Sequence, residues 1–183
     1  MIYAFLAEGF EEAEAILPLD LLIRAGLEIQ TVSITNDRPV IGTHGIPVMA
    51  DRTAADFPAL PEDAEMILLP GGMPGTQNLY ESPLVQACIR QAAERKLPLA
   101  AICAAPSVFG RMGLLKGKRA TCFPGFEDML LGAEATGEGL TVDGSVITAR
   151  ALGSAHDFAF AIIRMLKGAD TAERVRNSIF FEA

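Results

Sequence analysis

Short apolar runs alternate with longer amphipathic stretches along the whole chain. The runs at residues 2–7, 66–69 and 98–102 are almost continuously apolar, which is typical of strands buried on both faces of a parallel sheet. Residues 28–35 alternate between apolar and polar positions, and residues 119–123 have the length and composition of a further short strand. We predict a strand in each of these segments.

The first amphipathic stretch, residues 12–25, follows the first predicted strand. Its apolar positions recur at helical spacing, and Gly26 stands where a glycine commonly ends a helix. Pro18 falls inside this pattern, so we expect either a kink or a late helix start near Leu17.

Later stretches predict four further helices. Ser82 suits an N-cap and Pro83 suits a first helical turn, so one helix is expected to begin there. The other three are predicted from residue 104 to residue 115, from a capping-box-like sequence at Ser154 to Gly168, and from a second such sequence at Asp170.

Two further segments complete the pattern: residues 40–50 predict a hairpin or two short extended pieces, and residues 140–148 predict a hairpin. Residues 40–50 contain Gly42 and Gly45 between β-branched residues, and residues 140–148 contain the turn Asp143-Gly144. Strands that alternate with helices predict an α/β fold, with a mainly parallel sheet covered on both faces and a small β-hairpin. The length of 183 residues predicts a single domain over residues 1–183.

Composition narrows the classes of function. Half of the residues are apolar, the formal net charge is −8 and the pI is about 4.8. An acidic chain lacks the basic excess that binds nucleic acids or anionic lipids, so we expect neither nucleic acid nor membrane as a partner. The first residues lack the basic region of a secretion signal, and no apolar stretch approaches the ~18 residues of a membrane span.

Cysteine and histidine usage points to a reducing compartment. The three cysteines have no C-x-x-C spacing, which disfavours a disulfide framework or structural zinc. The two histidines do not cluster with them, and no nucleotide-binding fingerprint is present. We therefore expect a cytoplasmic protein that binds no metal and needs no cofactor.

The sharpest candidate for chemistry is Cys103, which lies between a predicted strand and a predicted helix. Small neighbours allow the tight strand–turn–helix of a nucleophile elbow, and a helix start favours the thiolate, so we expect a lowered thiol pKa. The alternative is a small buried hydrophobe, which is what we expect of Cys88 and Cys122. The small neighbours of the first cysteine are Ala100, Ala101, Ala104 and Ala105.

Two other segments follow strands at the edge of the sheet where open α/β folds place their sites. Gly71 and Gly72 allow close backbone approach and leave N–H groups free for an oxyanion, although an ordinary glycine turn explains them as well. Glu14 stands among apolar residues, where burial raises a carboxyl pKa and keeps a proton available for transfer. For Glu11 and Glu12, a favourable interaction with the helix dipole is enough to explain why acidic residues stand at the start of the predicted helix.

The remaining titratable candidates carry weaker signals. His44 falls in a glycine-flanked hairpin and is expected to be exposed, whereas His156 in a first helical turn is expected to be packed or solvated. Arg150 follows a strand, and a surface role is the default expectation for it.

Four segments taken together resemble the ThiJ/PfpI family, most closely its YajL-like and deglycase branch. The Ala-Ile-Cys-Ala-Ala-Pro sequence around Cys103, combined with an acidic first helix, is specific to that family. The resemblance implies a flavodoxin-like three-layer sandwich of the class I glutamine amidotransferase-like superfamily, and a homodimer. The matching segments are residues 6–14, 69–72, 100–106 and 145–160.

The resemblance also implies roles for individual residues. Cys103 matches the reactive, easily oxidised cysteine of the family, and Glu14 matches the carboxyl that hydrogen-bonds its sulfur. The implied anion pocket and the family arginine correspond to Gly71, Gly72, the N–H group of Ala104, and Arg150.

The chain departs from some relatives at three places. Phe123 stands where some members carry a histidine, so a third titrating partner is missing there. Ala104 follows the cysteine where the PfpI peptidases have a histidine. The late histidine, His156, is not part of the His-x-Glu sequence of glutamine-hydrolysing relatives. A peptidase and a glutaminase are therefore disfavoured.

These expectations lead to competing functional hypotheses. The first is a cysteine-dependent, cofactor-free enzyme of glyoxalase III or deglycase type, acting on α-oxoaldehydes such as methylglyoxal or on their adducts with proteins. The second is a non-catalytic redox sensor or protective chaperone that uses the same thiolate. A third, a flavodoxin-like binder of a small ligand, lacks a nucleotide fingerprint to support it.

Overall fold

The computed structural model describes residues 1–181, and a six-stranded sheet lies at its centre. The strand order is β2-β1-β5-β6-β10-β9, and every neighbouring pair is parallel except β10 with β9. The mainly parallel sheet that the sequence predicted is thus confirmed. Its strands are β1 (Ile2–Leu6), β2 (Ile29–Ser33), β5 (Met66–Leu69), β6 (Leu99–Ile102), β9 (Leu140–Asp143) and β10 (Val146–Ala149).

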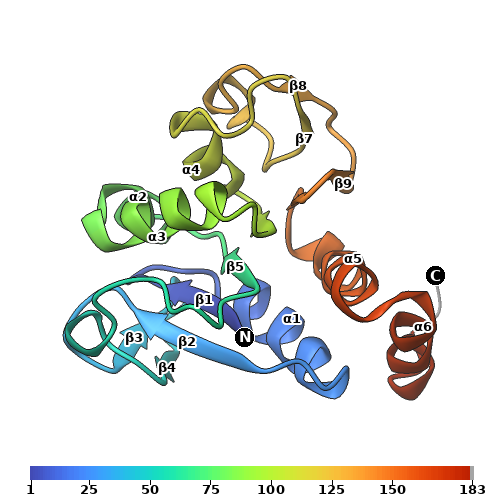
Figure 1. Cartoon of the computed structure of the whole chain (residues 1–183), viewed down its shortest axis with the longest axis horizontal. Coiled ribbons are helices and arrows are strands. Elements are labelled where there is room, and N and C mark those ends of the chain that lie inside the picture. Colours follow the sequence, from blue (N-terminus) through green and yellow to red (C-terminus); the bar gives the residue numbers. More distant parts are fainter. Residues whose placement is uncertain (182–183) are drawn as a thin grey trace.

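Helices cover both faces of this sheet, with α1, α5 and α6 on one side and α2, α3 and α4 on the other (Figure 1). Successive strand residues point to opposite faces, so Ile67 and Leu69 join one core cluster while Met66 and Leu68 join the other. The helices are α1 (Glu12–Arg24), α2 (Gly75–Glu81), α3 (Pro83–Glu94), α4 (Pro106–Arg111), α5 (Ala155–Lys167) and α6 (Ala169–Ser178).

Smaller elements surround the central sheet. The predicted hairpins are both present, one as β3 with β4 and the other as β9 with β10 around Asp143-Gly144. The remaining short elements are β3 (Pro39–Ile41), β4 (Pro47–Met49), β7 (Arg119–Ala120), β8 (Glu134–Ala135) and the 3₁₀ turns η1 (Ala54–Asp56), η2 (Glu127–Met129) and η3 (Leu152–Ser154).

Two predicted elements differ in the structure. The strand predicted over residues 119–123 stops at Ala120 and pairs with β8 outside the central sheet, so Cys122 lies in a loop, although it is buried as expected. The helix predicted from residue 104 begins at Pro106, because the N–H of Ala105 bonds the Ile102 carbonyl at 3.1 Å in a tight turn. α2 was not predicted, since its seven residues are too few to show helical periodicity.

Helix starts follow the sequence signals in part. Ser82 caps α3 as predicted, accepting a hydrogen bond from the Val85 N–H. α1 begins at Glu12 and runs through Pro18, so the late start is wrong. The capping boxes predicted for the last two helices are also wrong, because the Ser154 side chain makes no cap bond and α6 begins directly after Gly168.

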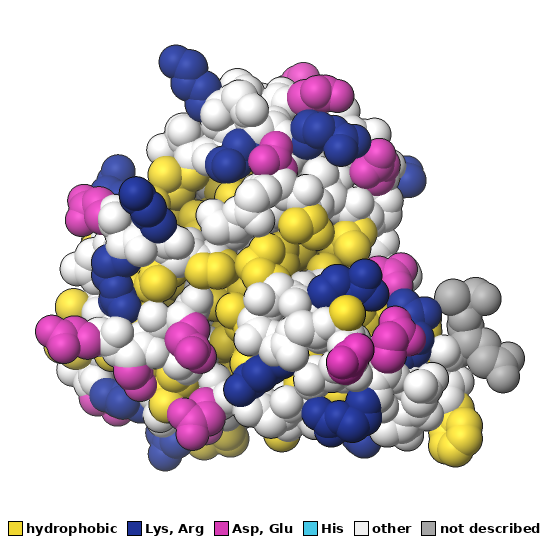
Figure 2. All heavy atoms as spheres, turned by 45° about the vertical axis from the view of Figure 1, so that its right-hand side comes forward, with side chains coloured by type: hydrophobic (Ala, Val, Ile, Leu, Met, Phe, Trp, Pro, Cys, Tyr) yellow, Lys and Arg dark blue, Asp and Glu magenta, His cyan; other side chains and the backbone are white. Residues whose placement is uncertain are grey.

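The surface has a band of apolar side chains across one face, with charged side chains of both signs mostly above and below it (Figure 2). Among residues 1–181, no helix has both the length and the apolar character needed to cross a membrane.

Candidate active site

Cys103 lies on the tight turn that follows β6. Its φ is 65°, a left-handed conformation that costs a non-glycine residue roughly 1–3 kcal/mol and therefore needs support from its surroundings. Two backbone hydrogen bonds supply it: the Cys103 N–H donates to the Ala149 carbonyl at 2.9 Å, and the Phe123 N–H donates to the Cys103 carbonyl at 2.8 Å. The turn leaves the side chain half-buried at the carboxyl end of the sheet.

Gly71 and Gly72, which follow β5, lie next to this turn. The backbone N–H groups of Gly72 and Ala104 act on the Cys103 sulfur, where they lower the thiol pKa. The N–H of Gly71 acts instead on the Glu14 carboxyl, whose pKa it lowers. Gly72 has a φ of 92°, which explains why glycine is needed there. The backbone donors predicted from the sequence are therefore gathered at one place, and they are divided between the sulfur and the carboxyl.

Glu14 reaches the same place from the first turn of α1. Glu14 is 2% exposed, and its carboxyl lies beside the Cys103 side chain, with a β-carbon at Gly71 falling 2.5 Å from both. Its Oε2 atom is buried without a hydrogen-bond partner of its own. If Oε2 carried a proton, its O–H group could donate a hydrogen bond to the Cys103 sulfur. The free-energy cost of a buried carboxylate oxygen without a partner would then be removed.

Burial raises the pKa of Glu14 to about 7. The negative charge of Glu11 acts in the same direction, while hydrogen bonds from Cys103 and from the backbone of Leu152 and Gly71 act against it. Glu14 is therefore poised to carry a proton near neutral pH, as its apolar sequence neighbours suggested.

The ionisation of Cys103 differs from the sequence expectation. Burial, followed by the charge of the Glu14 carboxylate, raises the pKa of Cys103 to about 12. The six-residue helix α4 begins beyond the turn, so its N-terminus offsets little of this effect. The low thiol pKa that we expected is thus wrong. A proton on Glu14 removes the repulsion by its carboxylate, but burial, the larger cause, still favours the thiol.

A pocket of about 200 Å³ opens beside the sulfur. Its walls come from the glycine loop after β5, the Cys103 turn and the segment after β7. The side chains that line it are apolar apart from the thiol itself. The lining residues are Gly72, Met73, Cys103, Ala104, Phe123 and Phe126.

The other predicted candidates lie outside this pocket. Arg150 is exposed and its guanidinium donates to the Gly137 carbonyl at 3.4 Å, so its predicted role in substrate binding stays a prediction. Cys88 and Cys122 are buried, and burial raises the pKa of each thiol to about 11. His156 is half-buried and stacks on Phe181, with ring centroids 4.5 Å apart.

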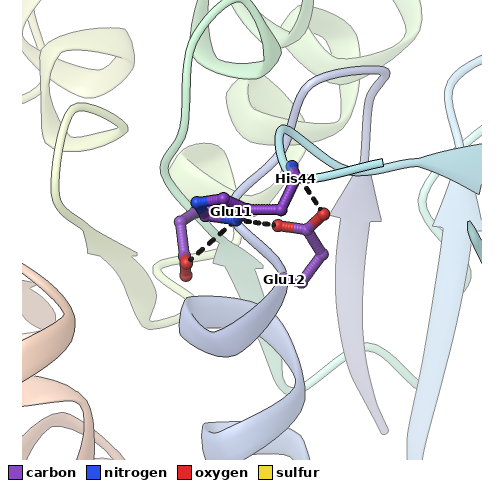
Figure 3. A group of neighbouring side chains, drawn as sticks. All are labelled: Glu11, Glu12 and His44. Carbon is purple, nitrogen blue, oxygen red and sulfur yellow. Dashed lines mark hydrogen bonds and ion pairs between the residues drawn. The ribbon is translucent and has the colours of Figure 1, made fainter. Parts of the chain in front are cut away.

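A second polar cluster lies at the start of α1 and joins this helix to the β3–β4 hairpin (Figure 3). The buried Glu12 carboxylate accepts hydrogen bonds from the backbone N–H of His44 at 2.8 Å and of Ile46 at 3.3 Å, and it lies 2.7 Å from His44 Nδ1. Glu11 caps α1 by accepting from the Glu14 N–H. The helix dipole is therefore not the main partner of Glu12, which corrects the simpler expectation.

Glu11, Glu12 and His44 place one ligand atom each within 4.8 Å of one another, which is a spacing that a metal ion tolerates. The Glu12 oxygens already serve His44 and Ile46, so the cluster is satisfied by its own contacts. The expectation that the protein binds no metal stays a prediction. The cluster was missed in the sequence because the hairpin histidine and the helix acids are 32 positions apart.

We expect replacement of His44 by alanine to lower the melting temperature more at about pH 6 than at about pH 9. The Glu12 hydrogen bond and charge raise the His44 pKa above its ordinary 6.5. The folded state therefore holds this proton more tightly, and the resulting stabilisation is complete below pH 6.5 and is lost as pH rises through the raised value. Melting curves of both proteins at the two pH values measure the effect.

The control for this prediction is the same replacement in Glu12→Gln protein. Without the carboxylate, loss of the imidazole should change the melting temperature equally little at both pH values. An equal loss at both pH values in the wild-type background would contradict the ion pair.

Comparison with known proteins identifies relatives over most of the chain. The profile of the DJ-1/PfpI family matches residues 1–165. The Parkinson disease protein 7 homolog of Danio rerio is 34% identical, covering 93% of this chain and 92% of that protein. Protein DJ-1 homolog B of Arabidopsis thaliana is 36% identical over 92% of this chain, which spans only 39% of the plant protein.

Solved structures agree with this result. A mutant of a DJ-1 superfamily protein from Salmonella typhimurium superposes with a TM-score of 0.93 at 30% identity, covering 100% of this chain and 98% of that one. The structure of oxidized Toxoplasma gondii DJ-1 also gives a TM-score of 0.93, at 28% identity and with the same coverage. The arrangement of sheet and helices described above is thus shared with these proteins.

Proposed function

The chain belongs to the DJ-1/PfpI family, and we propose that it is a cofactor-free enzyme in which Cys103 attacks α-oxoaldehydes such as methylglyoxal, or their adducts on proteins. The observation that carries this proposal is the contact between a half-buried thiol and a buried carboxyl with a pKa of about 7. Such a pair supplies a nucleophile and a proton carrier without a third titrating group.

The reaction follows from the positions of these groups. As the Cys103 sulfur adds to the aldehyde carbon of methylglyoxal, the ionised Glu14 takes the thiol proton. The N–H groups of Gly72 and Ala104 are the donors that we expect to stabilise the resulting oxyanion. Glu14 gives its proton to that oxygen, which forms the hemithioacetal. It then takes the proton from the former aldehyde carbon and delivers it to the neighbouring carbon, while the hydroxyl proton passes to the neighbouring oxygen, so that a lactoyl thioester results. Water hydrolyses the resulting thioester, which releases lactate and restores the thiol, so that one water is consumed for each lactate formed.

The test is a lactate assay with methylglyoxal as sole substrate, free of glutathione, metals and amine buffers. We expect Cys103→Ala to lose at least ~100-fold in lactate formation, because no other side chain at the site is a nucleophile. Its melting temperature should stay close to that of the wild type, since the side chain is small and half-buried. Lactate formation that survives this substitution would overturn the proposal.

A second candidate function is redox sensing or protection through the same cysteine. It is favoured by the partnerless Oε2 of Glu14, which in protonated form donates to a sulfinate oxygen on Cys103, and by the oxidized state in which a relative was solved. Two equivalents of peroxide should add two oxygens to Cys103 and release two waters. The yield should change in Glu14→Asp protein, whereas first oxidation of Cys88 or Cys122 would exclude this function.

We propose a homodimer in the cytoplasm as the setting for either function. Ile16 and Ile23 are exposed about two turns apart on α1, and Ile46 and Met49 are exposed on the adjoining hairpin. Apolar side chains of this size on neighbouring elements support an interface between two copies. Light scattering on the purified protein measures the number of subunits directly.

A further inference from the structure

The walls of the pocket beside Cys103 are more apolar than a substrate as small as methylglyoxal requires. Met73 is 47% exposed and Phe123 is 43% exposed, so both present apolar surface to water at the mouth of the pocket. Phe126 completes the wall. Large apolar side chains that remain hydrated beside a nucleophile mark a surface that a ligand can cover.

The aromatic wall is fixed to the nucleophile. The Phe123 N–H donates to the Cys103 carbonyl at 2.8 Å, and the Phe126 N–H donates to the Phe123 carbonyl at 3.1 Å. The backbone that carries the two rings is thus tied to the turn that carries the sulfur. A group that packs against these rings is therefore held near the sulfur.

We propose that the substrates of this site are 2-oxoaldehydes with an uncharged apolar substituent, aryl or branched alkyl, and that methylglyoxal is a poorer member of the class. This inference rests on the proposed function for its chemistry, and on the pocket alone for its choice of substituent.

Size supports the assignment. A cavity of about 150 Å³ lined by apolar side chains is large enough to bind benzene, so the pocket of about 200 Å³ accommodates a phenyl ring next to the two carbons of the oxoaldehyde. Methylglyoxal, with a methyl group in place of the ring, leaves most of this volume to water. Burial of the larger group in the pocket is therefore favoured by the hydrophobic effect.

Charge excludes the anionic members of the class. Within the part of the chain that the structure describes, no lysine or arginine lines the pocket, and the Arg150 guanidinium is bonded to the Gly137 carbonyl. The carboxyl next to the Cys103 thiol belongs to Glu14, and the charge of Glu11 acts on it from behind. A substituent that carries a carboxylate or phosphate would therefore be desolvated without a counter-charge.

The first experiment compares phenylglyoxal and methylglyoxal by the formation of mandelate and lactate. We expect kcat/KM to favour phenylglyoxal by about tenfold or more, since even one methylene in an apolar pocket is worth about 10-fold or more. Phe126→Ala should reduce this preference several-fold. Met129→Ala, which removes an exposed apolar side chain outside the pocket, should leave the preference unchanged. Phenylglyoxal also modifies arginine side chains, so its consumption by the Cys103→Ala protein is measured and subtracted.

The second experiment needs no turnover. Iodoacetamide and N-benzyl iodoacetamide carry the same reactive group, so the ratio of their alkylation rates at Cys103, divided by the ratio for free cysteine, measures the apolar preference. We expect a ratio of several-fold that falls in Phe126→Ala protein.

The outcomes separate the two proposals. A benzyl preference without formation of either acid would leave the substituent assignment standing and refute the enzyme. Lactate formation with no benzyl preference, or with methylglyoxal as the better substrate, would refute the substituent assignment and leave the enzyme standing.

Discussion

Replacement of Gly71 by alanine is expected to reduce lactate formation from methylglyoxal by ~100-fold or more, because misplacement of reacting groups by about 1 Å costs this much. A β-carbon at this position would stand 2.5 Å from the Cys103 Cβ and 2.5 Å from the Glu14 Oε2. It would also stand 2.9 Å from the Ile102 carbonyl oxygen, which the strand cannot move. Because Gly71 does not have a positive φ, the effect is one of space at the thiol–carboxyl contact.

The matched control is Gly153→Ala, since a β-carbon there meets nothing within 4 Å and the backbone is again not left-handed. Activity, the rate of Cys103 alkylation and the melting temperature should all remain near wild-type values in this control. Gly71→Ala protein that folds and keeps more than a tenth of the activity would show that the thiol–carboxyl contact is not needed in its observed form.

Replacement of Glu14 by glutamine is expected to lower lactate formation by roughly 10²- to 10⁴-fold, the usual contribution of a positioned general acid–base. Glutamine keeps the shape of the side chain and can donate to the sulfur, but it cannot accept and return a proton. Alkylation of Cys103 should persist, because the thiol and its backbone donors at Gly72 and Ala104 are unchanged. Glu12→Gln, at an acid that contacts the hairpin, is the control for activity. Full activity of the Glu14→Gln protein would remove the carboxyl from the mechanism.

The same substitution is expected to stabilise the protein in mildly alkaline solution. Burial raises the Glu14 pKa from 4.5 to about 7, so the folded state holds this proton more tightly than the unfolded chain. Wild-type stability therefore falls as pH rises between these two values, by an amount of the order of 3 kcal/mol at 1.36 kcal/mol per pKa unit. Glutamine carries no proton to lose, and its protein lacks this fall.

Urea unfolding at about pH 4 and about pH 8 measures this difference, since one value lies below and the other above both pKa values. The Glu14→Gln protein should equal the wild type at the lower pH and exceed it at the higher pH. A variant that is less stable than the wild type at the higher pH would mean that the folded protein compensates the buried charge better than its contacts indicate.

Local sequence signals were sufficient where one segment determines the structure by itself. The central strands around Met66 and Leu99 are short apolar runs, and Ser82 begins a helix because its own side chain caps the next turn. Cys103 and Glu14 were found for the same reason, since a strand end and an apolar context are visible in neighbouring residues. Their mutual contact followed only from the resemblance, because it joins two segments that are remote in the chain.

Features that depend on packing between remote segments could not be predicted. Met73 and Phe126 become pocket walls only when the loops after β5 and β7 meet at the cysteine. The thiol pKa was misjudged because burial raises it, and because the charge of Glu14 acts in the same direction from another element. His44 finds Glu12 only across the folded hairpin.

The position of β6 between β5 and β10 has a consequence for synthesis on the ribosome. Of the two strands that pair with β6, β5 is synthesised before it, whereas β10 is synthesised only after residues 103–145. A nascent chain that has folded up to β6 therefore exposes an unpaired, wholly apolar strand edge next to the cysteine turn. The edge of β6 stays unpaired until β10 has been synthesised. Only then can the Ala149 carbonyl accept the hydrogen bond from the Cys103 N–H, so the cysteine turn gains this supporting contact late in translation.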